Sequence, residues 1–103
     1  MLSWFKSLFG KSAPNFKKMV QEGAQIVDVR TGAEFSNGHI PNAQNLPLQD
    51  LKQQWHHLDK NKPVITCCAS GVRSASAAAL LKNNGFIAYN GGSWKSLQRQ
   101  ISN

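Results

Sequence analysis

Two adjacent cysteines, Cys67 and Cys68, are the most reactive side chains of this 103-residue sequence. A cysteine thiolate is a nucleophile, and the pKa of the thiol falls at a helix N-terminus or beside a cation. Gly71 follows Cys68 closely and permits a tight turn, and Arg73 adds a fixed positive charge. The residue types and their spacing therefore predict a nucleophilic cysteine in an anion-binding loop.

The elements on either side must place this loop between a strand and a helix. Pro63 opens an apolar, β-branched run at 64–66, which is typical of a buried strand, and strong helix formers fill most of 75–81. A tight turn from strand to helix directs its backbone N–H groups towards one point, where the helix dipole adds positive charge. We therefore expect the Cys68 sulfur to lie among these donors, with Ser74 capping the helix. The loop comprises Ala69, Ser70, Gly71, Val72 and Arg73.

Three blocks of the sequence, in order, resemble the rhodanese family. The loop Cys68-Ala-Ser-Gly-Val-Arg-Ser74 is similar to the Cys-x-x-Gly-x-Arg-Ser loop of its sulfurtransferases. Upstream stand Ile26-Val-Asp-Val-Arg30 and Gly38-His-Ile-Pro-Asn-Ala43, and downstream stands Gly91-Gly-Ser-Trp94. The resemblance implies an α/β domain over residues 14–103, with a small, mostly parallel sheet flanked by helices on both faces.

The same resemblance implies a sulfurtransferase that works through a persulfide on Cys68. The sulfane sulfur would come from thiosulfate or a persulfide and would pass to a thiol or to cyanide. Ala69 stands where many family members have a basic residue, which favours a low-molecular-weight or protein-bound persulfide as the donor. We expect neither a cofactor nor a metal.

Four residues are expected to support the site. In the resembling family, the residues at the positions of Asp28 and Arg30 support the core and the loops near the active site. His39 could act as a base for Cys68, or as a polar residue that ties two turns together; we favour the second role because a thiolate can be stabilised without a base. Ser74 is expected only as a cap. Arg73 could attract the anion, or could clamp the loop through a buried carboxylate.

Two other functions compete with sulfur transfer. Arg73 follows Cys67 by six positions, the spacing of phosphatases that share the rhodanese fold, and follows Cys68 by five, the spacing of sulfurtransferases. Gly71 fits the second count, and no aspartate follows in the loop to protonate a leaving group. Rhodanese-like domains also occur as non-catalytic sulfur-carrier or regulatory binding modules, usually without the cysteine. Cys67 is expected to face away from Cys68 as a small buried hydrophobe.

The remaining elements follow from apolar periodicity and turn residues. We expect helices at 14–21, 31–35, 48–58, 75–83 and 94–101, with Thr31 and Glu34 forming a capping box at the second. Strands are expected at 26–29, 43–46 and 86–89, and a turn at 90–92.

Composition narrows the class of protein. Twelve Lys and Arg against five Asp and Glu give a net charge of +7, which serves solubility or attracts anions. The basic residues are scattered, so we expect no nucleic-acid binding. Two neighbouring cysteines make no disulfide framework, which favours a cytoplasmic, reducing compartment. We expect a monomer.

Residues 1–13 lie outside the family pattern. Leu2, Phe5 and either Leu8 or Phe9 fall at helical spacing, and Lys6 and Lys11 add charge, which predicts an amphipathic extension. It lacks the continuous apolar stretch of a secretory signal. Packing on the domain, a mobile tail and contact with a membrane surface remain open for this segment.

Overall fold

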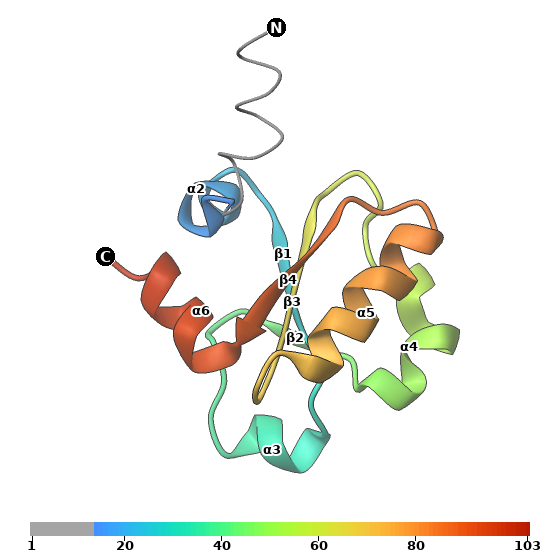
Figure 1. Ribbon diagram of the computed structural model, residues 1–103, viewed down its shortest axis with the longest axis horizontal. Coiled ribbons are helices and arrows are strands. Elements are labelled where there is room, and N and C mark those ends of the chain that lie inside the picture. Colours follow the sequence, from blue (N-terminus) through green and yellow to red (C-terminus); the bar gives the residue numbers. More distant parts are fainter. Residues whose placement is uncertain (1–13) are drawn as a thin grey trace, which may run out of the picture.

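The structure, a computed structural model, describes residues 14–103 (Figure 1). Four strands form one sheet in the order β2-β1-β3-β4, and all three pairings are parallel. The strands are β1 (Gln25–Asp28), β2 (Gln44–Asn45), β3 (Val64–Cys68) and β4 (Ala88–Ser93). The helices are α2 (Phe16–Gln21), α3 (Gly32–Ser36), α4 (Leu48–Gln54), α5 (Val72–Asn83) and α6 (Trp94–Ile101), and the 3-10 helix η1 (Trp55–His57) continues α4. The extension expected at 1–13 lies outside the described residues.

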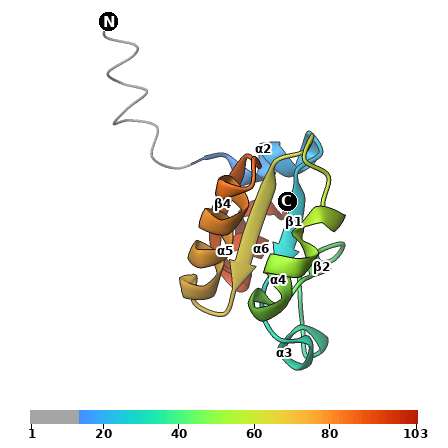
Figure 2. The same ribbon diagram turned by 90° about the vertical axis from the view of Figure 1, so that its right-hand side faces the viewer.

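Helices cover both faces of the sheet, which confirms the expected layered α/β architecture. Figure 1 shows α2 and α6 on one side of the strands and α4 and α5 on the other, and Figure 2 looks onto the side that α4 and α5 cover. Each face has its own apolar core. Within residues 14–103, no helix has the length and apolar character needed to cross a bilayer.

Strand β3 lies at the centre and supplies side chains to both cores. All five of its residues are buried, as expected for a strand covered on two faces. Ile65 and Cys67 pack with the residues under α2 and α6, whereas Val64 and Cys68 pack with those under α4 and α5. The predicted opposition of the two cysteines is confirmed, because side chains alternate along a strand.

Strand β4 corrects the predicted end of the sheet. The sequence predicts a strand at 86–89 and a turn at 90–92, but the strand spans Ala88–Ser93. Thr66 pairs with Asn90 and Cys68 with Ser93, so β4 carries one extra residue beside the end of β3. Gly91 permits this close approach, since a Cβ there would lie 2.7 Å from the carbonyl oxygen of Thr66. Asn90 is the last β4 residue before this irregularity, and its side chain reaches the loop that follows β3.

The carboxyl ends of the parallel strands meet at the edge where α3 lies (Figure 1). Helix α3 begins with the predicted capping box: the Thr31 hydroxyl accepts from the Glu34 N–H, and the Glu34 carboxylate accepts from the Thr31 N–H. Ligands of open α/β sheets bind at such an edge. The predicted loop starts at this edge, directly after β3.

Candidate active site

Cys68 is the last residue of β3, and its sulfur accepts hydrogen bonds from the turn that follows. The N–H of Gly71 donates to Sγ at 3.0 Å and the N–H of Ser74 at 3.4 Å. Gly71 is the N-cap residue of α5 and has no side chain to satisfy the first N–H groups of the helix. The cysteine sulfur therefore occupies the position that a capping oxygen normally takes.

The loop can close around the sulfur because glycine occupies two positions in contact. Gly71 has φ +103°, a left-handed conformation that other residues adopt at a cost. A Cβ on Gly71 would lie 3.3 Å from the Cα of Gly92, in the irregular part of β4. The turn thus packs backbone against backbone on β4, and its N–H groups point at Cys68.

The environments of the two thiols differ in a way that selects Cys68 as the nucleophile. Burial acts to raise the pKa of Cys68, but the hydrogen bonds that the Ser74 hydroxyl and the backbone N–H groups of Ser74, Gly71 and Ser70 can give to the thiolate outweigh it, and the pKa is lowered. Burial raises the pKa of Cys67 to about 12, and the nearby Asp28 carboxylate acts in the same direction. Near neutral pH the thiolate therefore forms at Cys68 in preference to Cys67.

The sulfur lies beneath the loop rather than in an open mouth. Cys68 has an exposed fraction of 0%, whereas Ala69 and Ser70 are exposed and Val72 is 73% exposed. The sulfur is therefore not directly accessible from solution in this conformation.

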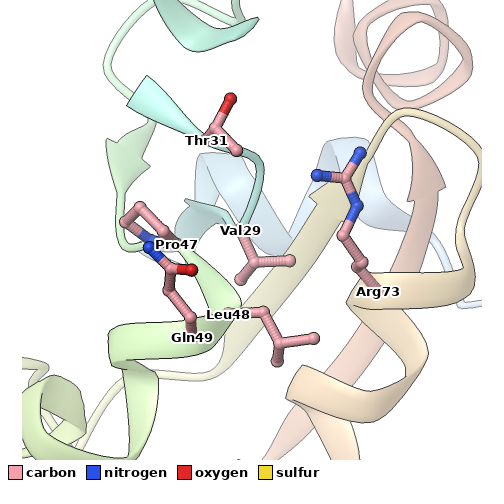
Figure 3. A pocket seen from close by; sticks show the side chains of 6 residues that line it. All are labelled: Val29, Thr31, Pro47, Leu48, Gln49 and Arg73. Carbon is pink, nitrogen blue, oxygen red and sulfur yellow. The ribbon is translucent and has the colours of Figure 1, made fainter. Parts of the chain in front are cut away.

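A cavity of about 260 Å³ lies beside the loop (Figure 3). It opens between the start of α4 and the start of α5, beyond the carboxyl ends of β1 and β2. Its wall is mostly apolar, with one guanidinium on the side of the loop. The lining residues are Val29, Thr31, Pro47, Leu48, Gln49 and Arg73.

Arg73 forms an ion pair across this edge of the sheet. Its Nη1 and Nη2 donate to the two carboxylate oxygens of Glu34 at 2.8 and 3.0 Å. The prediction of a buried carboxylate partner is wrong in one respect, because the Glu34 side chain is 37% exposed. Glu34 also completes the capping box of α3, so the pair joins the start of α5 to α3.

The Glu34–Arg73 pair makes a prediction about acid stability. The hydrogen bonds from Arg73, with smaller effects from Thr31, lower the pKa of Glu34 from 4.5 to about 2. A carboxyl group whose pKa is lowered by folding stabilises the fold above its unfolded pKa, and this contribution is lost as the pH falls through the folded value. We expect the unfolding free energy of Glu34→Gln to depend less steeply on pH between about 4.5 and 2 than that of the wild type, in denaturant titrations. Because the pair is half-exposed, the difference is expected to be small. Equal slopes for the two proteins would contradict this role.

Asp28 and Arg30 form a buried pair near the end of β1. Three side-chain hydrogen bonds of 2.7 to 3.0 Å join the guanidinium to the carboxylate. Arg30 also donates to the carbonyl oxygens of Gly38 at 2.8 Å and Glu34 at 3.3 Å. The pair thus anchors the segment that contains α3, which agrees with its expected role in supporting the loops near the active site.

His39 lies on the surface, on the segment after α3. Its Nδ1 donates to the carbonyl oxygen of Phe35 at 2.7 Å, which fixes the proton on Nδ1, and its ring stacks on that of Phe35 at 3.7 Å. None of the side-chain hydrogen bonds within residues 14–103 joins it to Cys68. This geometry agrees with His39 as a polar residue that ties two turns together, and it does not support His39 as a base for Cys68.

Ser74 and Asn90 alter the predicted site. Ser74 is not the cap of α5: it lies in the first turn of the helix, fully buried, with its Oγ 3.3 Å from the Cys68 sulfur. The same oxygen lies 2.6 Å from Oδ1 of Asn90. Asn90 has no role in the predicted site because the sequence pattern indicates a turn at 90–92. The available signal is that a polar residue follows the last predicted strand, at its carboxyl end.

The site has the features of an anion-binding nucleophile. No group of three or more His, Cys, Asp or Glu side chains in residues 14–103 is placed to hold a metal ion. The loop donors, the lowered pKa of Cys68 and the adjacent Arg73 all favour a negative charge on sulfur.

Comparisons with known proteins agree with this geometry. A family model described as Rhodanese-like domain matches residues 12–100. The uncharacterized protein YqhL of Bacillus subtilis is 47% identical over 62 residues, which cover 60% of this chain and 49% of that protein. The thiosulfate sulfurtransferase GlpE of Shewanella oneidensis is 38% identical over 65 residues, which cover 63% of this chain and 64% of that protein.

A crystal structure gives the same answer for the fold. The rhodanese-like domain protein from Staphylococcus aureus superposes with a TM-score of 0.67 at 33% identity, over 92% of this chain and 83% of that one. The chain spans less than two thirds of the length of either curated relative named above. Since the family model extends over nearly the whole sequence, the chain belongs to the rhodanese-like domain family.

Proposed function

We propose that this protein is a sulfurtransferase that carries a sulfane sulfur as a persulfide on Cys68. One observation supports this proposal above the others: the Cys68 sulfur accepts N–H groups from the first turn of α5 at 3.0 and 3.4 Å. Such donors stabilise an anion at the sulfur without a base and without rearrangement. The relative named as a thiosulfate sulfurtransferase supports the same reaction class.

The reaction proceeds in two half-reactions. In the first, the Cys68 thiolate attacks the sulfane sulfur of the donor; a new S–S bond forms, the donor's own S–S bond breaks, and the leaving group departs with the electron pair as a thiolate or as sulfite. In the second, a thiolate or cyanide attacks the terminal sulfur, and Cys68 leaves as a thiolate. No oxidant or reductant is needed, and the kinetics are ping-pong.

The site favours persulfides over thiosulfate as donors. Ala69 brings no charge to the loop, and both Nη atoms of Arg73 already donate to Glu34. A dianionic donor therefore finds little unpaired positive charge beside the sulfur. The cavity beside Arg73 has a mostly apolar wall, which suits the body of a thiol acceptor or the side chains of a protein donor.

Two alternative functions make different demands on the two cysteines. A cysteine phosphatase would use Cys67, but Cys67 faces the opposite core and its pKa is raised to about 12. A non-catalytic binding module would not need a thiol of lowered pKa within a ring of donors. We therefore place both behind sulfur transfer.

Intact-protein mass spectrometry tests the proposal directly. The reduced protein is incubated separately with thiosulfate, with cysteine persulfide and with inorganic polysulfide, and is then weighed. We expect a mass gain of one sulfur atom, in a larger fraction of the protein with the persulfide donors than with thiosulfate. Cyanide is expected to remove this sulfur and release thiocyanate. Absence of any gain with all three donors would favour the binding module, and turnover of an aryl phosphate would favour the phosphatase.

A further inference from the structure

The side chain of Asn90 connects the loop, strand β4 and the residue beside the sulfur. Its Nδ2 donates to the carbonyl oxygen of Gly71 at 3.1 Å, and its Oδ1 accepts from the N–H of Gly92 at 2.9 Å. The same Oδ1 lies 2.6 Å from Oγ of Ser74. Asn90 therefore lies next but one to the sulfur, in the chain Asn90–Ser74–Cys68.

These contacts determine where the proton of the Ser74 hydroxyl lies. Rotating the Asn90 amide by half a turn would set its NH₂ against the N–H of Gly92, so the oxygen must face Gly92 and Ser74. An amide oxygen only accepts, and a hydroxyl has a single proton, so the Ser74 hydroxyl donates to Asn90. It therefore offers a lone pair, and no proton, to the Cys68 sulfur 3.3 Å away.

That arrangement suits a thiol and opposes a thiolate. A neutral Cys68 donates its own S–H proton to Oγ of Ser74, whereas an anionic sulfur would face a lone pair. The conflict ends when the Ser74 hydroxyl turns from Asn90 to the sulfur, which leaves Oδ1 of Asn90 with the Gly92 N–H as its donor. The turn breaks one hydrogen bond and forms another, and no proton leaves Ser74.

We propose that Asn90 is a positioning residue for Cys68. While the sulfur is neutral, the Ser74 hydroxyl donates its hydrogen bond to the amide oxygen of Asn90; when the sulfur becomes an anion, the hydroxyl turns and donates to the sulfur instead. The inference rests on the proposed function, because it describes how the nucleophile of that reaction is set. Asn90 and the sulfur compete for the same proton. Asn90 therefore holds the thiolate back, and Ser74 stabilises the thiolate only at the expense of its bond to Asn90.

The charged groups around Cys68 stay in place in the test. They are Arg73 on α5 with its partner Glu34 on α3, and the buried pair of Asp28 and Arg30 at the end of β1. The other thiol, Cys67, titrates far above neutral pH, with a pKa of about 12. A titration of thiolate absorbance, with Cys68→Ser as the blank, therefore reports on Cys68.

Two substitutions at Asn90 are expected to move that titration in opposite directions. Asn90→Ala removes the competing acceptor, so the Ser74 hydroxyl is free to donate to the thiolate and the pKa of Cys68 falls by about half a unit to one unit. Asn90→Asp keeps an acceptor for Ser74 and makes it an anion, so the pKa rises. Both variants lose the hydrogen bond to Gly71. Loss of that bond alone would loosen the loop donors around the thiolate and raise the pKa in both variants, so the fall in Asn90→Ala is the distinguishing result.

Ser74→Ala supplies the matched control. In the Ser74→Ala background we expect Asn90→Ala to leave the pKa of Cys68 unchanged, because the hydroxyl that links the two residues is gone. An increase in pKa for Asn90→Ala, or a decrease that persists without Ser74, would overturn the inference. The titration reads the sulfur directly, so failure of wild-type sulfur loading beside the expected shifts would reject the proposed function and leave the proton arrangement standing.

Discussion

Cys68→Ser is expected to take up no sulfur from any donor and to lose cyanide-dependent turnover by about 10³-fold or more. The reason is chemical: a serine hydroxyl stays protonated without a base, and His39, the base considered from the sequence, is hydrogen-bonded to Phe35 on the surface. The backbone donors of the loop remain in the variant. Intact mass after exposure to cysteine persulfide, and thiocyanate release, measure the two losses.

Cys67→Ser is the matched control, because it makes the same change one residue away. Cys67 lies in the opposite core, and with a pKa of about 12 it carries almost no thiolate at pH 7. We expect the mass gain to persist, with some loss of stability from a hydroxyl in an apolar site. Sulfur uptake by Cys68→Ser, or loss of uptake in a folded Cys67→Ser, would contradict the assignment of the nucleophile.

Asp28→Ala is expected to lower the free energy of unfolding by about 3–5 kcal/mol. The Asp28 carboxylate is fully buried, and the Arg30 side chain that it holds is 5% exposed. Removing the carboxylate leaves a buried guanidinium without its counter-charge, which is far costlier than losing a surface pair. Small domains are stable by about 5–15 kcal/mol, so denaturant titration should show a much lower midpoint.

A double substitution separates the cost of the uncompensated Arg30 charge from the cost of the lost hydrogen bonds. In Asp28→Ala/Arg30→Met no uncompensated charge is buried, although the hydrogen bonds to Gly38 and Glu34 are gone. We expect the double variant to be more stable than the sum of the two single changes predicts. Strict additivity would show that the pair contributes nothing as a pair, and that Arg30 acts only through the segment containing α3.

The centre of the site could be predicted because its causes are local. Strand β3, the loop and helix α5 are contiguous, and apolar runs, a glycine and helix formers specify each in turn. The alternation of Cys67 and Cys68 follows from strand geometry alone. The capping box at Thr31 has the same local origin.

The errors concern partners that are distant in the sequence. Glu34 and Arg73 are 39 positions apart, and Ser74 and Asn90 are 16 apart, so no local pattern joins them. Ser74 is assigned as a cap because hydroxyls commonly cap helices, but the Cys68 sulfur already accepts the N–H groups of that turn. The sequence of β4 predicts a turn because glycines usually mark turns, whereas Gly91 is needed there for close approach to β3.

The position of the Cys68 sulfur at the N-terminus of α5 also affects the stability of the helix. In the proposed cycle, the negative charge moves outward by one atom when Cys68 is loaded, from Sγ to the terminal sulfur. The amide of Ser74 then faces a neutral divalent sulfur, a weaker acceptor than the thiolate. The first turn of α5 should therefore open more readily in the persulfide form, so that the hydrogen-exchange rate of the Ser74 amide would report whether Cys68 carries a sulfur.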